Sequence, residues 1–272
     1  MKFVRCIIPI QQQIDQRRFD HFGTSVFLEI ESRHVLVSAA HVFLDQNLWI
    51  FGEPRNVPLN EFSFAATSPD LATAKNDPVD IAFAELPNEI AQMLKDGGFA
   101  ALQMSDTAYV ARPSNDRAAF SGFPCTKSKL QVGLQQMRLQ PVFLEGPLLS
   151  QDELTVAGYD PETSLAIPYR RQKQFDARAK MPITGMEPYG MSGGPIWRFD
   201  DNGQPWLAGI GFKFDEARTL LVGTKIEEVF ALIQQQSIER WLANQAKPVR
   251  KLVFDLKTGR LETDTGEGST PP

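Results

Sequence analysis

The feature that most restricts the fold is a series of short apolar segments separated by turn signals. Segments of about five to eight residues rich in Val, Ile, Phe and Leu recur along the chain, and helical periodicity is weak until late. In one of them, residues 24–31, Leu28 and Ile30 share one face while Glu29 and Glu31 share the other. Segments of this kind are typical of an all-β sandwich or barrel. The sequence therefore predicts a mainly β protein.

Only two segments are predicted to be helices. Residues 87–98 form a short one that ends at a glycine pair, a common stop signal. Residues 224 to about 243 form a longer one, with apolar residues near helical spacing. The other expected elements are strands at 4–8, 60–66, 134–145 and 153–157 and a hairpin from Arg250 onward, and the last residues, 262–272, are expected to be disordered.

Composition excludes several classes of protein. The 272-residue chain has a formal charge of −5, whereas a nucleic-acid-binding domain would usually show a basic surplus. It contains no apolar run that could span a membrane and no secretory signal pattern, so we expect no membrane or nucleic-acid partner. A secreted protein of this size would usually carry several disulfides, so Cys6 and Cys125 are expected to be buried free thiols. These observations together predict a cytoplasmic protein, and one from a bacterium.

The segment Gly190-Met191-Ser192-Gly193-Gly194-Pro195 is poorly suited to a helix or a strand interior. Glycines allow another backbone to approach closely, which a nucleophilic serine needs when main-chain N–H groups must converge on a substrate oxyanion. The segment also fits the G-x-S-x-G motif of α/β-hydrolases, whose histidine follows the serine. Here His21, His34 and His41 all precede it, so that motif is excluded.

Two further segments carry residues suited to acid–base chemistry. His41 follows Val35-Leu36-Val37-Ser38-Ala39-Ala40, and the small residues before it leave room for a tightly packed general base. Asp80 opens the apolar segment 80–86, where a carboxylate can be partly buried beside an imidazole. Asp77, which precedes a proline, is the rival and fits a turn. His21 and His34 have no comparable context, and His34 is expected to be exposed at a hairpin turn.

These three blocks, in the order His, Asp, Ser, resemble the motifs of the trypsin-like serine peptidases, in particular of bacterial members. The resemblance implies a mainly all-β fold of two six-stranded antiparallel β-barrels packed together with the active site between them, plus a C-terminal helix and a short extension. It also implies an N-terminal barrel at 1–112, a C-terminal barrel with its closing helix at 113–245, and a partly disordered extension at 246–272.

The resemblance also implies a role for each residue that matches a family motif. Ser192 would attack the carbonyl carbon, His41 would take and return the proton, and Asp80 would orient His41. The backbone N–H groups of Gly190 and Ser192 would form the oxyanion hole. The residues expected to contact the substrate are Met186, Ile210, Gly211 and Phe212. The family mechanism needs no metal and no cofactor.

Two departures from the family pattern leave questions open. Met191 stands where digestive members have an acidic residue, so the loop must be held by packing of Met191 or remain unformed until a partner binds. Met186 aligns with the base of the substrate pocket and suggests an apolar cleavage site, but a one-residue gap would place Glu187 there and favour Arg or Lys. We therefore expect a serine endopeptidase acting on proteins or peptides through an acyl-enzyme. The alternative is a catalytically silent fold that acts as a binding module or requires an activating protein partner.

Overall fold

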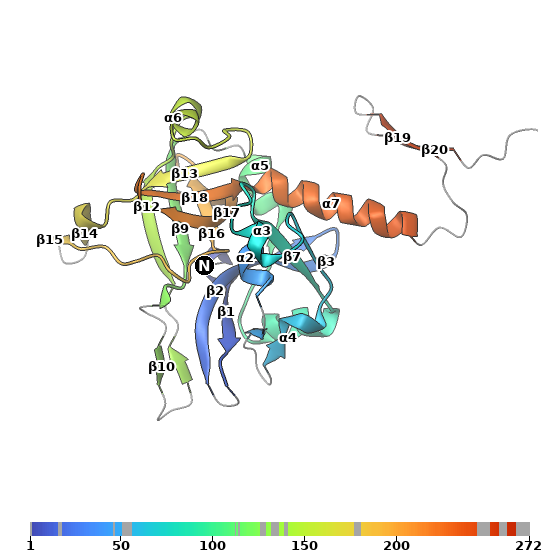
Figure 1. Cartoon of the computed structure of the whole chain (residues 1–272), viewed down its shortest axis with the longest axis horizontal. Helices are drawn as coiled ribbons and strands as arrows, with labels where there is room; N and C mark the ends of the chain where they lie inside the picture. The colour runs from blue at the N-terminus through green and yellow to red at the C-terminus, as the bar shows by residue number, and fades with distance from the viewer. Residues whose placement is uncertain are drawn as a thin grey trace, which may run out of the picture. The chain divides into compact units, whose positions relative to one another are not determined.

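The computed structural model describes residues 2–15, 18–45, 47–50, 56–111, 113, 115–125, 129–131, 136–138, 141–176, 181–243, 251–255 and 260–264. The chain divides into two compact units, Met1–Phe230 and Ala231–Pro272. The first unit contains two curled antiparallel sheets, drawn from blue to cyan and from green to orange in Figure 1. Every residue of the predicted site lies in this first unit.

The first sheet has eight strands in the order β5-β4-β1-β2-β3-β7-β6, with β8 paired parallel to β2. Its strands are β1 Ile7–Gln13, β2 Phe19–Ile30, β3 Arg33–Ala39, β4 Leu48–Ile50, β5 Val57–Pro58, β6 Phe64–Ala66, β7 Ile81–Leu86 and β8 Leu102–Gln103. The register places Phe27 opposite Leu36 in the β2–β3 pair, and both side chains are fully buried. Each buried side chain of this size stabilises the fold by roughly 1.5–3 kcal/mol.

The second sheet has six strands in the order β12-β9-β16-β17-β18-β13. Its strands are β9 Arg117–Gly122, β12 Val142–Pro147, β13 Ser164–Pro168, β16 Pro195–Phe199, β17 Pro205–Asp215 and β18 Leu220–Lys225. Three two-stranded pairs complete the β structure: β10 Lys129–Gln131 with β11 Gln136–Arg138, β14 Gln174–Asp176 with β15 Met181–Ile183, and β19 Lys251–Asp255 with β20 Arg260–Asp264.

Most of the described helices are single turns that join strands. The α-helices are α1 Lys2–Arg5, α2 Ala40–Phe43, α3 Leu71–Ala74, α4 Asn88–Asp96, α5 Ala108–Ala111, α6 Gln151–Val156 and α7 Ile226–Ala243, and the 3₁₀ turns are η1 Leu59–Glu61, η2 Met104–Asp106 and η4 Arg171–Lys173. The helix α2 matters most for the site, because it starts immediately after β3 and carries His41.

The predicted fold class is confirmed: the protein is mainly β, with two curled antiparallel sheets and a C-terminal helix. The first sheet has two more strands than expected because the two-residue strands β5 and β8 add to it. The predicted helices correspond to α4 and α7, and the predicted C-terminal hairpin corresponds to β19 and β20. The strand register of that hairpin pairs Lys251 with Asp264 and Asp255 with Arg260.

Three local predictions are wrong. Residues 153–157 lie mostly in the helix α6, because Ser150 caps it and forms a capping box with Glu153. Residues 4 and 5 belong to α1, and the first strand instead runs through Pro9. That proline is tolerated because β4 pairs with β1 only from Ile10 onward, which leaves one side of Pro9 without a strand partner. Residues 60–66 form a strand only in their second half, β6, after η1.

The remaining predictions have mixed outcomes. Both cysteines are free, but only Cys6 is buried, and Cys125 is exposed. The tail predicted to be disordered lies mostly outside the described residues, and its first part belongs to β20. The boundaries at 112/113 and 245/246 stay predictions, although the two large sheets lie on either side of the first one. None of the helices in the described residues is both long enough and apolar enough to cross a membrane.

Candidate active site

His41 and Asp80 are joined by two hydrogen bonds. The His41 Nδ1–H donates to Asp80 Oδ2 at 2.5 Å, and the His41 backbone N–H donates to Asp80 Oδ1 at 2.9 Å. A third bond runs from the Ala40 backbone N–H to the Asp80 carbonyl oxygen at 3.1 Å. Because the carboxylate accepts at Nδ1, the other imidazole nitrogen is left facing away from Asp80, where it can act as a base.

The carboxylate of Asp80 is almost completely buried, with 4% of its side chain exposed, whereas 25% of the His41 side chain is exposed. Burial raises the pKa of Asp80, and the bonds from His41 only partly oppose this effect. Asp80 also has a positive φ of 44°, in the left-handed region that Asp adopts more readily than most residues. Its rival Asp77 instead accepts hydrogen bonds from the hydroxyls of Thr67 and Ser68.

Ser192 is hydrogen-bonded to Phe212, a residue that lines a cleft together with His41 and Asp80. The Ser192 Oγ–H donates to the Phe212 carbonyl oxygen at 3.2 Å. A cavity of about 400 Å³ is lined by His41, Asp80 and Phe212, among others. Among the described residues, no hydrogen bond joins Ser192 to His41. A serine–histidine hydrogen bond is often absent before substrate binds. The structure thus places His41 and Asp80 in one cleft with Phe212, and turns the Ser192 hydroxyl toward the Phe212 carbonyl.

The loop around Ser192 leaves two N–H groups available. Within the described part of the chain, the backbone N–H groups of Gly190 and Ser192 have no hydrogen-bond acceptor, whereas those of Met191 and Gly193 bond to the carbonyl oxygens of Pro188 and Gly211 at 3.1 and 2.7 Å. Gly190 and Gly193 both have a φ of +86°. An oxyanion hole requires free backbone donors of this kind near the nucleophile, and these two belong to the serine itself and to the residue two positions before it.

Glycine is required at position 193 for steric reasons as well. A Cβ atom there would lie 1.9 Å from the Thr24 carbonyl oxygen and 2.0 Å from Ser38 Oγ. Those two atoms belong to the first sheet, where the Ser38 hydroxyl donates to the Thr24 carbonyl at 2.7 Å. The loop that carries Ser192 is therefore seated directly against strands β2 and β3 of the first sheet.

Met191 is fully buried and packs in an apolar cluster that includes Phe120, Ile196 and Leu221. A Cβ atom added at Gly122 would lie only 3.1 Å from Met191, so the two segments are in close contact. Of the two ways left open for holding this loop, packing of Met191 is the one present in the structure.

The residues predicted to contact substrate occupy different environments. The Ile210 side chain is fully buried, and its backbone pairs with Pro195 on one side and Thr224 on the other. The Gly211 N–H donates to the Gly194 carbonyl, and the Gly211 carbonyl accepts from the Gly193 N–H. Among the described residues, the side of β17 that faces β16 has no strand partner from Phe212 onward, starting at the β-bulge between residues 211 and 213.

The base of the predicted substrate pocket is fixed by polar contacts. The Tyr169 hydroxyl donates to the Met186 carbonyl oxygen at 2.8 Å. The Glu187 carboxylate forms an ion pair with Arg171 at 2.8 Å. A basic substrate side chain would therefore meet a carboxylate that already has a cationic partner.

Sequence reasoning missed the location of two histidines. His34 is not exposed at a turn: 13% of its side chain is accessible, and its Nε2 lies 2.8 Å from Lys95 Nζ and 3.4 Å from Glu29 Oε2. His21 is buried, and its Nε2 lies 3.0 Å from the carbonyl oxygen of Gly190. No local sequence signal marks the contact between His21 and Gly190, because the two residues are 169 positions apart.

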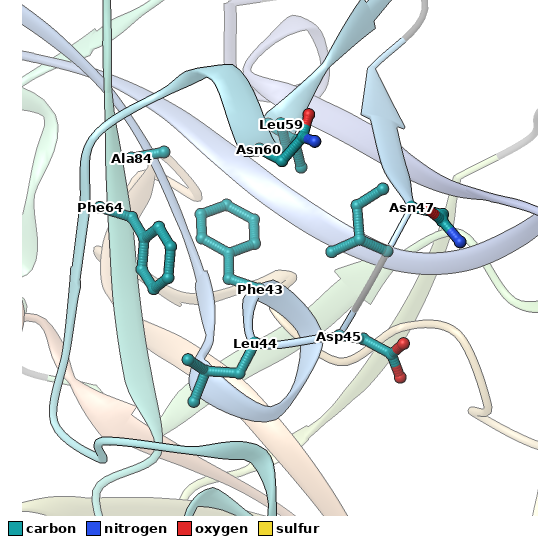
Figure 2. Close-up of a pocket in the computed structure, with 9 residues that line it drawn as sticks. Phe43, Leu44, Asp45, Asn47, Leu59, Asn60, Phe64 and Ala84 are labelled. Carbon is teal, nitrogen blue, oxygen red and sulfur yellow. The ribbon is translucent and has the colours of Figure 1, made fainter.

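A second cavity, of about 310 Å³, lies beside the helix α2. Figure 2 shows that the rings of Phe43 and Phe64 line it, with Asp45, Asn47 and Asn60 supplying polar groups. Phe43 is two residues after His41 on the same helix, so this cavity and the cleft share one structural support. The described residues contain no cluster of three or more His, Cys, Asp or Glu side chains that could hold a metal ion.

No protein-family model and no curated protein matches the chain. Among solved structures, the Vibrio cholerae VesB protease is similar with a TM-score of 0.53 and 17% identity, covering 86% of this chain and 64% of that one. The Glu endopeptidase has a TM-score of 0.47 at 11% identity, covering 86% and 91% of the two chains. The serine protease domain of the Sesbania mosaic virus polyprotein has a TM-score of 0.46 at 12% identity, covering 82% and 89%. The likeness to the VesB protease shows the chymotrypsin-like two-barrel fold.

Proposed function

We propose that this chain, which has the two-barrel fold of the trypsin-like serine proteases, is a serine endopeptidase that acts on proteins or peptides through an acyl-enzyme. The observation that carries the proposal is the bonded His41–Asp80 pair in the same cleft as Phe212, whose carbonyl holds the Ser192 hydroxyl. The neighbouring loop leaves two N–H groups without acceptors. A purely structural histidine would not need a buried carboxylate beside a serine and a pair of free donors.

In the first half of the reaction, Ser192 Oγ forms a bond to the carbonyl carbon of the scissile peptide while His41 Nε2 takes its proton. Asp80 stabilises the imidazolium that results, and the N–H groups of Gly190 and Ser192 bind the oxyanion. The C–N bond then breaks, the amine leaves with the proton from His41, and an ester on Ser192 remains. Water, deprotonated by His41, hydrolyses that ester. Loss of one oxyanion donor typically costs about 10²–10³ in rate.

The geometry also suggests how a substrate lies in the cleft. An extended peptide can add to the free edge of β17 that begins at Phe212. If a peptide N–H donates to the Phe212 carbonyl, it displaces the Ser192 hydroxyl, which then turns toward His41. With Glu187 already paired to Arg171, we favour an apolar side chain at the cleavage site, held near Met186.

The domain division and the compartment are part of the same proposal. Residues 1–112 would form the barrel that supplies His41 and Asp80, and residues 113–245 the barrel that supplies Ser192, with 246–272 as an extension. The free thiols of Cys6 and Cys125 support a reducing compartment, the cytoplasm of a bacterium. The mechanism uses no metal and no organic cofactor.

The test is digestion of a mixed peptide library by the wild-type protein and by the Ser192→Ala and His41→Ala variants. We expect cleavage by the wild type and none by either variant, and no change on addition of a metal chelator. Cleavage that survives in Ser192→Ala would refute the proposal. In the same library, cleavage mainly after Arg or Lys that disappears in Glu187→Ala would overturn the apolar preference.

One observation favours a second candidate function. Ser192 is bonded to Phe212 and not to His41, which is also what a silent fold, or an enzyme awaiting an activating protein partner, would show. These alternatives predict that the folded wild type leaves the library uncut. A partner-dependent enzyme would regain cleavage when cell extract is added, and Ser192→Ala would not.

A further inference from the structure

Strand β2 contacts the Gly190–Ser192 loop through hydrogen bonds from two residues. His21 Nε2 lies 3.0 Å from the Gly190 carbonyl oxygen, and Thr24 Oγ1 donates to the same oxygen at 2.9 Å. The Thr24 backbone N–H donates to the Ser192 carbonyl at 2.8 Å. One carbonyl thus accepts two bonds and has both lone pairs occupied. The loop of the second sheet is held by side chains of the first.

The protonation of the His21 ring follows from its partners. A carbonyl oxygen can only accept, so Nε2 must carry a proton. On the other side of the ring, Gln11 Nε2 lies 3.4 Å from His21 Nδ1, and with the Gln11 amide placed this way Nδ1 accepts its N–H. His21 is 8% exposed, and burial lowers its pKa more than its hydrogen bonds to the backbone of Gly190 and Phe123 raise it, which agrees with a neutral imidazole. The imidazole is therefore a neutral donor fixed at both nitrogens.

The bonded carbonyls determine where the free N–H groups point. In a trans peptide the C=O and N–H point to opposite sides. The Cys125 backbone N–H holds the Tyr189 carbonyl at 2.8 Å, which turns the Gly190 N–H away from Cys125. The bonds from His21 and Thr24 to the Gly190 carbonyl fix the orientation of the peptide between residues 190 and 191. This peptide lies between the free N–H groups of Gly190 and Ser192. A Cβ atom at Gly190 would lie 2.6 Å from Cys125 Sγ, so the loop has little room to rearrange.

We propose that His21 is a positioning residue of the oxyanion hole: its Nε2–H, with the Thr24 hydroxyl, holds the Gly190 carbonyl so that the N–H groups of Gly190 and Ser192 stay turned toward the substrate. The proposal rests on the proposed function, because it assigns a role to those two N–H groups. His21 does not touch the reacting atoms. It acts through the backbone of residues 190–192.

The experiment compares His21→Gln with His21→Asn in the full chain. Glutamine can place an amide N–H near the position of Nε2, whereas asparagine is too short to do so. The matched control is His34→Asn, because His34 is also partly buried in the first sheet but contacts Glu29 and Lys95. The probe is a fluorophosphonate, for which the maximal rate of reaction with serine (kinact) and the half-saturating concentration (KI) are measured separately.

We expect His21→Asn to lower kinact by about 10- to 100-fold, less than the loss of a whole oxyanion donor, with KI within about 2-fold. His21→Gln should recover most of the rate, and His34→Asn should react like the wild type. A wild-type kinact in folded His21→Asn would overturn the proposal. Equal losses in His21→Asn and His21→Gln would assign the effect to ring packing and would also overturn it.

A second measurement keeps this test separate from that of the proposed function. If the wild type does not react with the probe, the proposed function fails, but the loop contact can still be tested by hydrogen–deuterium exchange. The N–H groups of Met191 and Gly193 are bonded inside the loop and should be protected. We expect them to exchange faster in His21→Asn than in His21→Gln or the wild type. Equal exchange in all three proteins would show that His21 does not position the loop.

Discussion

Replacement of Met191 by alanine tests how the Ser192 loop is held. The substitution removes three side-chain heavy atoms from a fully buried position. Buried methionine-to-alanine changes cost about 2–5 kcal/mol, depending on how far the neighbours can close the cavity. A backbone segment in close contact with Met191 is that of Gly122, which has no side chain to fill the space. We therefore expect a loss of about 3–4 kcal/mol in the free energy of unfolding.

That loss should be visible in thermal unfolding. For a unit of this size, Met1–Phe230, each kcal/mol lowers Tm by about 2–4 °C, so the expected decrease is about 6–16 °C. The loop should also become less well ordered, because Met191 lies between Gly190 and Ser192, whose N–H groups are proposed to form the oxyanion hole. We expect kinact with a fluorophosphonate to fall by at least about tenfold at a temperature where the variant is folded.

The matched control is Met93→Ala in the helix α4, where the side chain is 8% exposed and distant in sequence from the loop. It should lose a comparable amount of stability and keep its kinact. If both variants lose stability to the same extent and both keep the wild-type kinact, Met191 packing does not hold the oxyanion loop. That result would refute the reasoning.

Three further predictions follow from individual contacts. Asp80→Asn should lower kinact by about 10³–10⁴ while the fold is kept, and a loss below tenfold would contradict the role of Asp80. Burial lowers the pKa of His21 in the folded protein below 6.5, so between these two pKa values the unfolded chain binds more protons than the folded one. The free energy of unfolding of the wild type should therefore fall as the pH drops through 6.5. Urea titrations should show a smaller fall for His21→Gln. Ser150→Ala removes the cap of α6 and should cost about 1 kcal/mol in the free energy of unfolding, with an unchanged kinact; no loss would argue against that helix.

Much of the fold can be predicted from the sequence, and so can the candidate site residues, because both are marked locally. Alternation in residues 24–31 predicts β2, and small residues before His41 predict a packed base. The helix α6 is also marked locally, by the capping residues Ser150 and Glu153, although strand propensity alone predicts a strand at residues 153–157.

Other features were not predictable from local patterns. The contact between His21 and Gly190 depends on how the two sheets pack, and neither residue has a neighbour in sequence that indicates it. The same holds for Ile210, whose backbone is paired within the sheet, and for Gly211, whose backbone is bonded to Gly193 and Gly194; together they move the free edge of β17 to Phe212. Long-range packing of this kind follows from the whole core and not from any one segment.

The most direct test of the central claim is to map the adduct that a fluorophosphonate forms with the folded wild-type protein. Mass spectrometry of the intact chain and of its peptides would give the stoichiometry and the modified residue. We expect one adduct per chain, on Ser192, and none in His41→Ala, because reaction requires both the base and the proposed oxyanion N–H groups to be in place. A folded wild type that forms no adduct, or forms it on another residue, would contradict it.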